Sequence, residues 1–216
     1  MAFLFETVLP SLLTGALVTI TVTIASLALA LALGFGLALL RQFLGFRVLS
    51  ILIDIYTEYF RNIPALTHLF IIYFGLAAVG LRLSSLTAAI IGLGLVGAAI
   101  TCEIFRSGFI AVKIGQTEAA RAVGMTPMQT IWLILAPQAI RISLPPLGNY
   151  ALQLMKDTSI VSAIAAPEIM FNARSMVTSS FQTTLIYTTA AMIYLLISLP
   201  MVHAISRLEA RFGRRN

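Results

Sequence analysis

Ionisable side chains interrupt some of the most apolar stretches of this sequence, and they are its first candidates for chemistry. Lys156 and Asp157 are neighbours inside one such stretch, and Glu103 lies inside another. A charged group in mid-membrane costs about 2.5–3.5 kcal/mol on insertion scales, so it usually faces a cavity or the interior of a helix bundle. Because no nucleophile–base pair accompanies these residues, they indicate a polar pathway rather than a catalytic centre.

The stretch around Lys156 and Asp157 contains further polar residues at helical spacing. Prolines and a glycine at 145–148 loosen the start of this helix, and residues 157–159 could cap a restart after a break. A broken helix would offer free backbone N–H and C=O groups to a zwitterion. The alternative, which does not exclude the first, is that Lys156 and Asp157 form structural ion pairs with neighbouring helices. The side chains that align approximately along one side are Asn149, Gln153, Lys156 and Asp157.

Two other polar clusters allow the same two interpretations. Glu58 and Arg61 are three residues apart, as are Glu103 and Arg106, so each pair could form a salt bridge on one helix face. His68 stands alone on an apolar stretch and is interpreted as a packed residue rather than a proton relay. No two histidines or cysteines have metal-ligand spacing, so we expect neither a metal site nor catalysis. The candidate pathway residues are Asn149, Gln153, Lys156, Asp157, Thr158, Asn62 and Glu103.

The composition places these residues in a membrane protein. The chain has 216 residues, of which 59% are hydrophobic and 10% charged, whereas roughly 25% are charged in a soluble domain. Spanning the hydrocarbon core takes about 20 apolar residues in a helix, and the long apolar segments do not alternate as barrel strands do. We therefore predict one all-α integral membrane domain, residues 1–216, with five transmembrane helices. The predicted spans are 9–40, 51–79 (interrupted by RNIP), 86–110, 144–166 and 184–205.

The distribution of basic residues predicts the orientation of these spans. Positive charge is retained on the cytoplasmic side of a membrane. With the C-terminus inside, only Arg82 and Arg174 would lie outside, which favours an N-out, C-in topology. No cleavable signal peptide is expected, and without a basic stripe interleaved with aromatics we expect no nucleic-acid binding. The basic residues that would then be cytoplasmic are Arg41, Arg47, Arg106, Lys113, Arg121, Arg141, Arg207, Arg211, Arg214 and Arg215.

One apparent dinucleotide-binding motif is a coincidence of spacing. Gly92, Gly94 and Gly97 satisfy the pattern G-x-G-x-x-G, but a dinucleotide site requires a preceding strand, a βαβ unit and an acidic residue about twenty positions later. Inside a predicted membrane helix, small residues let neighbouring backbones approach closely. We therefore expect these glycines to serve helix packing.

The stretch EAARAVGMTPMQTIWLILAP, residues 118–137, interrupts the apolar pattern with two short helices and a corner. Gly124 is placed to end the first helix in a left-handed conformation. Thr126, Pro127 and Gln129 form the pattern of an N-cap, a first helical residue and a capping box. Pro137 predicts a break or kink, which leaves a helix of about nine residues, too short to span lipid at about 1.5 Å per residue. That helix should lie along the membrane surface.

Glu118 is followed by the small pair Ala119–Ala120, which presents a nearly bare backbone with one charge. Such a surface suits a knob that enters a protein cleft, although an amphipathic surface loop is the alternative. The pattern E-A-A, three residues, glycine, nine residues and I-x-x-P resembles the EAA loop of membrane permease subunits of bacterial ABC importers. Ala136 departs from it, since leucine is usual before the proline. The residues that match the pattern are Glu118, Ala119, Ala120, Gly124, Ile134 and Pro137.

The resemblance extends over roughly residues 12 to 205. YTEYFRNIPALTHLFIIYFGL, CEIFRSGFIAVKIGQTEAARAVGM and LPPLGNYALQLMKDTSIVSAI resemble blocks of permeases for polar amino acids. Ile63, where threonine is more usual, and His68, where a less ionisable residue is common, depart from these blocks. The resemblance implies a multi-pass permease of the bacterial inner membrane that pairs with a second copy or a close paralogue.

The same resemblance implies two cytoplasmic ATPase subunits, whose surface grooves receive the EAA loop, about residues 113–137, and an extracytoplasmic amino-acid-binding protein. The chain lacks the phosphate-loop pattern G-x-x-x-x-G-K-[ST], so ATP would be bound by the partner and the chain itself would be neither an enzyme nor a cofactor carrier. A gradient-driven carrier or channel that uses Asp157, Glu103 or His68 is the main alternative, and an intramembrane enzyme a second. The implied coupling residues are Glu118, Ala119, Ala120, Arg121, Gly124 and Pro137.

Overall fold

A computed structural model describes residues 3–43 and 46–212, and these residues form helices joined by short turns. Arg214 and Arg215, counted above among the cytoplasmic charges, lie outside the described residues. Within the described residues, four continuous helices are long and apolar enough to cross a membrane, and one bent pair of helices would be the fifth crossing. The predicted all-α membrane fold is confirmed.

The centre of the bundle is the long contact between α1 (Leu9–Phe43), which continues the π-helical turn η1 (Leu4–Val8), and α5 (Ser85–Ala111). The two helices cross closely because α1 carries a glycine where α5 carries a threonine. A Cβ on Gly34 would lie 2.9 Å from both the Ala98 carbonyl oxygen and the Cys102 backbone nitrogen. Thr101 Oγ1 donates a hydrogen bond to the carbonyl of Ala30 on α1, at 2.7 Å. Small residues therefore bring the two backbones together.

The glycines of the apparent dinucleotide motif lie in this packed region, as expected from the sequence. Gly92, Gly94 and Gly97 are all buried on α5. A Cβ on Gly94 would lie 2.5 Å from the Leu29 side chain, and one on Gly97 would lie 2.7 Å from Ala30 Cβ. Each glycine leaves room for a neighbouring side chain.

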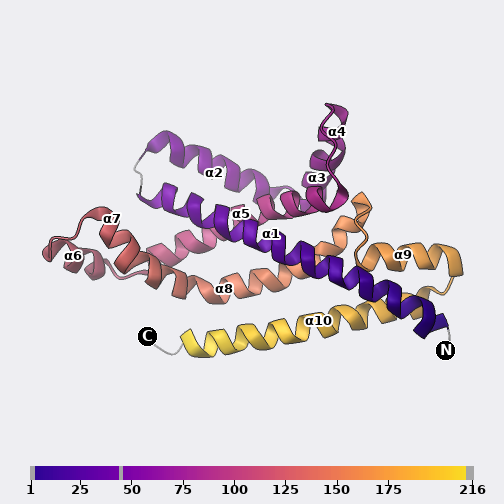
Figure 1. Ribbon diagram of the computed structural model, residues 1–216. Coiled ribbons are helices and arrows are strands. Elements are labelled where there is room, and N and C mark those ends of the chain that lie inside the picture. Colours follow the sequence, from indigo (N-terminus) through magenta and orange to yellow (C-terminus); the bar gives the residue numbers. More distant parts are fainter. Residues whose placement is uncertain (1–2, 44–45, 213–216) are drawn as a thin grey trace.

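The second predicted span, 51–79, is not one straight helix. α2 (Arg47–Asn62) is followed by α3 (Ala65–Phe70), the π-helical turn η2 (Ile71–Gly75) and α4 (Leu76–Ala78), and the two halves are bent by 104°. Figure 1 shows α3 and α4 turning away from the direction of α2. Pro64 supplies no backbone N–H, and Ile63 before it is extended, with φ −105° and ψ 136°. Both effects of a proline combine to end α2 here.

The fourth predicted span begins earlier than expected, because the chain is not broken at Pro137. After α6 (Ile114–Ala122), one continuous helix comprises α7 (Pro127–Gln129), the π-helical η3 (Thr130–Leu135), α8 (Ala136–Asp157) and the 3₁₀-helical η4 (Thr158–Ile164). The wider π-helical turn before Pro137 gives its ring room that an α-helical turn lacks. The predicted short helix is therefore not separate, because it continues directly into the helix of the fourth predicted span.

The predicted restart of the helix at residues 157–159 is also wrong. α8 accommodates Pro145 and Pro146 without a break and tightens directly into η4, and Asp157 makes no side-chain capping bond there. The turn is satisfied within the chain, since Thr158 Oγ1 donates to the carbonyl of Met155 at 2.7 Å. A 3₁₀ helix keeps its backbone groups paired, so the free polar groups expected of a broken helix are not available here.

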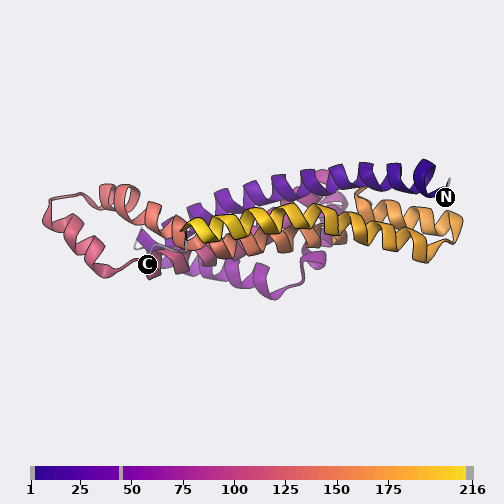
Figure 2. The same cartoon turned by 90° about the horizontal axis from the view of Figure 1, so that it is seen from below.

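The last elements are α9 (Ile169–Ser180) and α10 (Thr183–Phe212), the latter containing the fifth predicted span. α6 and α7 project from one end of the elongated bundle, at the same end as the last turns of α10 (Figures 1 and 2). α9 and the first turns of α1 lie at the opposite end. The first turns of α1 and the last turns of α10 thus lie at opposite ends of the bundle, and which end is cytoplasmic stays a prediction.

Candidate functional site

The coupling segment, defined as residues 113–137, is a helical hairpin with a tight tip. Gly124 has φ +77°, the left-handed conformation predicted for it. The Gly124 N–H donates to the Arg121 carbonyl and the Met125 N–H to the Ala120 carbonyl, both at 3.0 Å. These are the two bonds of a Schellman motif, which closes the C-terminus of α6.

The predicted capping box at the start of α7 is present. The Gln129 N–H donates to Thr126 Oγ1 at 3.3 Å, and the Thr126 N–H donates to Gln129 Oε1 at 2.9 Å. Pro127 occupies the first helical position, where its missing N–H is not needed. The geometry of the corner therefore follows from local residue types.

The coupling segment exposes three charged side chains, Lys113, Glu118 and Arg121, and several apolar ones. Glu118, Ala119 and Arg121 are exposed on α6, whereas Ala120 is only 4% exposed and packs inward. Several large apolar side chains exposed on one short segment are typical of a protein or membrane contact. The large exposed apolar residues of this segment are Ile114, Val123, Met128, Trp132 and Leu133.

The polar residues of α8 face away from the interior of this chain. Asn149, Gln153 and Lys156 are exposed, and Asp157 is half-buried. Gln153 Nε2 donates to Asp157 Oδ1 at 2.9 Å, so these two side chains form one polar group. A stripe of this kind lies within a helix long enough to cross a membrane, where exposure to lipid would be costly.

Lys156 and Asp157 turn in different directions, as expected for neighbours on a helix. Asp157 bonds Gln153, whereas Lys156 lines a surface groove of about 420 Å³ between α8, α9 and α10. Within the described part of the chain, neither residue belongs to an ion pair. The structural ion pairs considered as an alternative are thus not formed inside this subunit. The groove is lined by Met155, Lys156, Ser159, Met170, Tyr194, Leu195 and Ser198.

Asn62 and Glu58 form a second polar group at the end of α2. Asn62 Nδ2 donates to Glu58 Oε2 at 2.6 Å and to the Glu58 carbonyl at 2.8 Å. In the described residues Glu58 makes no ion pair with Arg61, so the suggested bridge between them is not formed. Both Asn62 and Arg61 are exposed at the bend before Pro64.

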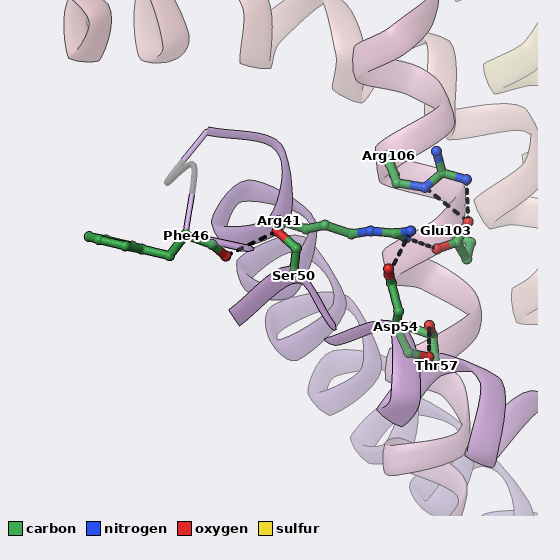
Figure 3. Close-up of polar contacts among 7 residues, drawn as sticks. All are labelled: Arg41, Phe46, Ser50, Asp54, Thr57, Glu103 and Arg106. Carbon is green, nitrogen blue, oxygen red and sulfur yellow. Dashed lines mark hydrogen bonds and ion pairs between the residues drawn. The ribbon is translucent and has the colours of Figure 1, made fainter. Parts of the chain in front are cut away.

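Glu103 lies at the centre of a charge cluster that joins three helices (Figure 3). Arg41 on α1 contacts Asp54 on α2 at 2.6 Å and Glu103 on α5 at 2.5 Å. Glu103 also pairs with Arg106, at 2.6 Å, which realises the i,i+3 pair suggested by the sequence. The parts played by Arg41 and Asp54 were not anticipated, because neither stands at helical spacing from Glu103. Two positive and two negative groups balance each other.

Glu168 is a further polar residue that the sequence analysis missed. It is 0% exposed and precedes α9. Its carboxylate accepts hydrogen bonds from the N–H groups of Phe171 (2.7 Å) and Met170 (2.9 Å) and from the Tyr194 hydroxyl (2.8 Å). Glu is not among the preferred N-cap residues, so residue type alone gave no signal for this cap.

Comparison with known proteins identifies the family. Residues 30–215 match the family described as "Binding-protein-dependent transport system inner membrane component". The chain belongs to this family. The permease is therefore a multi-pass inner-membrane transport subunit, as predicted from its EAA pattern.

Individual relatives agree with this assignment. The permease is 37% identical to a probable glutamine ABC transporter permease of Bacillus subtilis strain 168, GlnM, over 169 residues, which is 78% of each chain. It is 31% identical to the glutamine transport system permease GlnP of Escherichia coli K12 over 159 residues, 73% of each chain. Both relatives are named as permeases for glutamine, and the first as an ABC transporter permease.

Solved structures share the fold of the permease. The crystal structure of an amino acid ABC transporter with histidines matches with a TM-score of 0.87 and 30% identity, over 94% of both chains. An inward-facing structure of the MetNI methionine ABC transporter matches with a TM-score of 0.79 over 95% of this chain and 98% of the other, at 22% identity. The second match supports the fold alone.

The charge cluster of the permease leads to a stability prediction. Glu103→Ala would remove the carboxylate that pairs with both Arg41 and Arg106. The side chains of these three residues are only 19–30% exposed, so water would compensate poorly for the lost ion pairs. We expect a loss of about 2 kcal/mol, between the values for exposed and fully buried pairs. Thermal unfolding of the detergent-solubilised permease would measure it, with the exposed Glu58→Ala as control. An equal unfolding temperature for the two variants would contradict a stabilising role for the cluster.

Glu168, which lies between the fourth and fifth membrane-crossing helices, should make stability depend on pH. Burial raises the pKa of the Glu168 carboxyl, against the opposing effect of its three hydrogen bonds. A raised folded-state pKa gives a stability contribution that is fully present below the unfolded value, about 4.3, and is lost as pH rises through the folded value. As pH rises from about 4.3 through the folded-state pKa of Glu168, the unfolding temperature of the wild type should fall. Over the same pH range, the unfolding temperature of Glu168→Gln should fall less, because glutamine does not ionise. Parallel pH curves for the two proteins would contradict this.

Proposed function

We propose that the permease forms the translocation pathway of an ABC importer for polar amino acids and couples it to separate ATPase subunits. The observation that supports this most strongly is the coupling segment, which projects from one end of the bundle and exposes Glu118 as well as several large apolar side chains. Relatives named for glutamine transport support the substrate class. This end of the bundle is cytoplasmic in the proposed topology.

The exposed polar stripe of α8 supports pairing with a second permease, identical or paralogous. Asn149, Gln153 and Lys156 are exposed on a membrane-crossing helix, and lipid is a poor environment for them. A second subunit that faces this stripe would enclose it as a water-accessible pathway. In that pathway, Lys156 and Asp157 offer both signs of charge to a zwitterionic amino acid, with Asn62 as a further candidate. Thr158, the other candidate from the sequence, is 0% exposed and donates its hydroxyl to the Met155 carbonyl, so it does not line this stripe.

Two ATPase subunits, one for each permease, are the proposed partners of the coupling segments. The small, exposed Ala119 lets another protein approach the α6 backbone beside Glu118, and Arg121 provides a second charge. ATP would be bound by those subunits, because this chain has no phosphate loop. An extracytoplasmic binding protein would deliver the amino acid at the opposite end of the bundle. Closure of the ATPase pair would then switch the pathway between its outward and inward openings.

Transport by the reconstituted complex tests this function. The permease would be purified with its ATPase and placed in vesicles that contain ATP, with the binding protein and a panel of radiolabelled amino acids outside. We expect uptake of polar amino acids that requires both ATP and the binding protein, without an ion gradient. Uptake that needs an ion gradient and no ATPase would overturn the proposal in favour of a secondary carrier, with Asp157 and Glu103 as the residues to examine.

A further inference from the structure

α6 is connected to α5 by a short non-helical joint. Val112, which ends α5, has φ −68° and ψ 129°, and Lys113, which precedes α6, has φ −57° and ψ 133°. Two consecutive extended residues interrupt the helical hydrogen bonds, so that α5 and α6 are separate helices with different directions. The covalent link to α5 does not by itself fix the position of α6.

α6 is instead attached to the helix that follows it, at three levels. At the tip, the Schellman motif of Gly124 and the capping box of Thr126 set the angle of the corner. Midway, Ala120 is 4% exposed, and α6 packs against η3. At the base, Gln138 Nε2 donates to Gln116 Oε1 at 3.2 Å, and to the Ile134 carbonyl at 2.8 Å. Together, the contacts at the tip, in the middle and at the base keep α6 from bending or twisting relative to the helix that follows it.

The helix to which α6 is attached leads directly to the candidate pathway. The helix from Pro127 to Ile164 is continuous over 38 residues, and it carries the exposed stripe of Asn149, Gln153 and Lys156. A displacement at Glu118 would therefore pass through Gln116 and Gln138 into α8. Since helices are stiff along their axes, the far end of α8 would move with it.

We propose that Gln116 and Gln138 are positioning residues that join the coupling segment and α8 into one rigid body. Force from an ATPase would then move α8, with its pathway side chains, rather than α5. Gln138 lies outside the coupling segment, and neither glutamine belongs to the proposed pathway. This inference rests on the proposed function, because it assigns the helix on which the ATPase acts.

The test compares the number of amino acids transported per ATP hydrolysed in reconstituted vesicles. Gln138→Ala and Gln116→Ala remove the bridge, and we expect each to lower this ratio about fivefold, the scale of one lost hydrogen bond. The double variant Gln116→Glu with Gln138→Lys replaces the bridge with an ion pair and should restore the ratio. ATPase subunits should copurify normally with Gln138→Ala, because Gln138 lies outside the coupling segment; this separates positioning from docking.

A glycine inserted between Val112 and Lys113 provides the contrasting variant. It loosens the joint to α5 and leaves the bridge intact, so the ratio should stay near that of the wild type. The inference is overturned if Gln138→Ala keeps the wild-type ratio, if the double variant does not restore it, or if the insertion is equally harmful. Failure of the wild type to associate with any ATPase would instead refute the proposed function itself.

Discussion

The Glu118→Lys permease is expected to lose substrate-stimulated ATP hydrolysis, by roughly thirtyfold, while remaining folded. Glu118 is exposed on α6 and makes no ion pair within the described residues, so its replacement should leave the subunit itself unchanged. At a protein interface, disruption of a buried charge contact costs about 2–5 kcal/mol. Reversal of the charge should therefore weaken the complex with the ATPase, as measured by copurification and by ATP hydrolysis in vesicles.

Glu6→Lys is the matched control for this variant. It makes the same change of charge at an exposed site on the first turns of the chain, at the opposite end of the bundle. Copurification of the ATPase should be normal for Glu6→Lys. If Glu118→Lys and Glu6→Lys retain the ATPase equally, the coupling segment is not the docking surface, and the proposed function loses its main support.

The second large effect is expected at the contact between α1 and α5. Gly34→Ala would place a methyl group 2.9 Å from two backbone atoms of α5, the Ala98 oxygen and the Cys102 nitrogen, as well as against the Thr101 hydroxyl. Backbone atoms within a helix cannot move aside as a flexible side chain can, so the two helices must separate. Overpacking lowers the free energy of unfolding by about 1–3 kcal/mol. We expect a loss of about 3 kcal/mol or more for Gly34→Ala, because backbone atoms are in the way. A lower unfolding temperature and a lower yield of folded permease would report this loss.

Gly36→Ala on the same helix separates packing from helix propensity. Nothing lies within 4 Å of a Cβ at Gly36, and alanine favours a helix over glycine by about 1 kcal/mol. This variant should be as stable as the wild type or slightly more so. Equal destabilisation by Gly34→Ala and Gly36→Ala would show that the close contact is not what stabilises this helix pair.

The sequence by itself determined the features that depend on composition or on residues a few positions apart. Low charge and long apolar segments identified a helical membrane protein. Gly124 and the capping box of Thr126 and Gln129 determined the corner of the coupling segment, because every bond of that corner joins residues at most five positions apart. The EAA pattern identified the family for a related reason, since its residues share one short surface hairpin.

Proline was the local signal that predicted least reliably. At Pro64 the helix ends and the chain bends by 104°, as the proline rule predicts. At Pro137, and again at Pro145 and Pro146, the helix continues. The outcome depends on whether neighbouring turns can widen and whether packing on other helices stabilises the continuous form. These conditions are not readable from the residues next to a proline.

Only the tertiary structure decided which distant polar groups meet. Arg41 and Glu103 are 62 positions apart, Glu168 and Tyr194 are 26 apart, and Gln116 and Gln138 are 22 apart. For the first two pairs, which lie away from water inside the bundle, each polar group must find a partner wherever the helices bring one close. The partner is set by the angles at which helices cross, and small residues such as Gly34 control those angles through close contacts. Helical periodicity describes one helix at a time, so it could not predict these pairs.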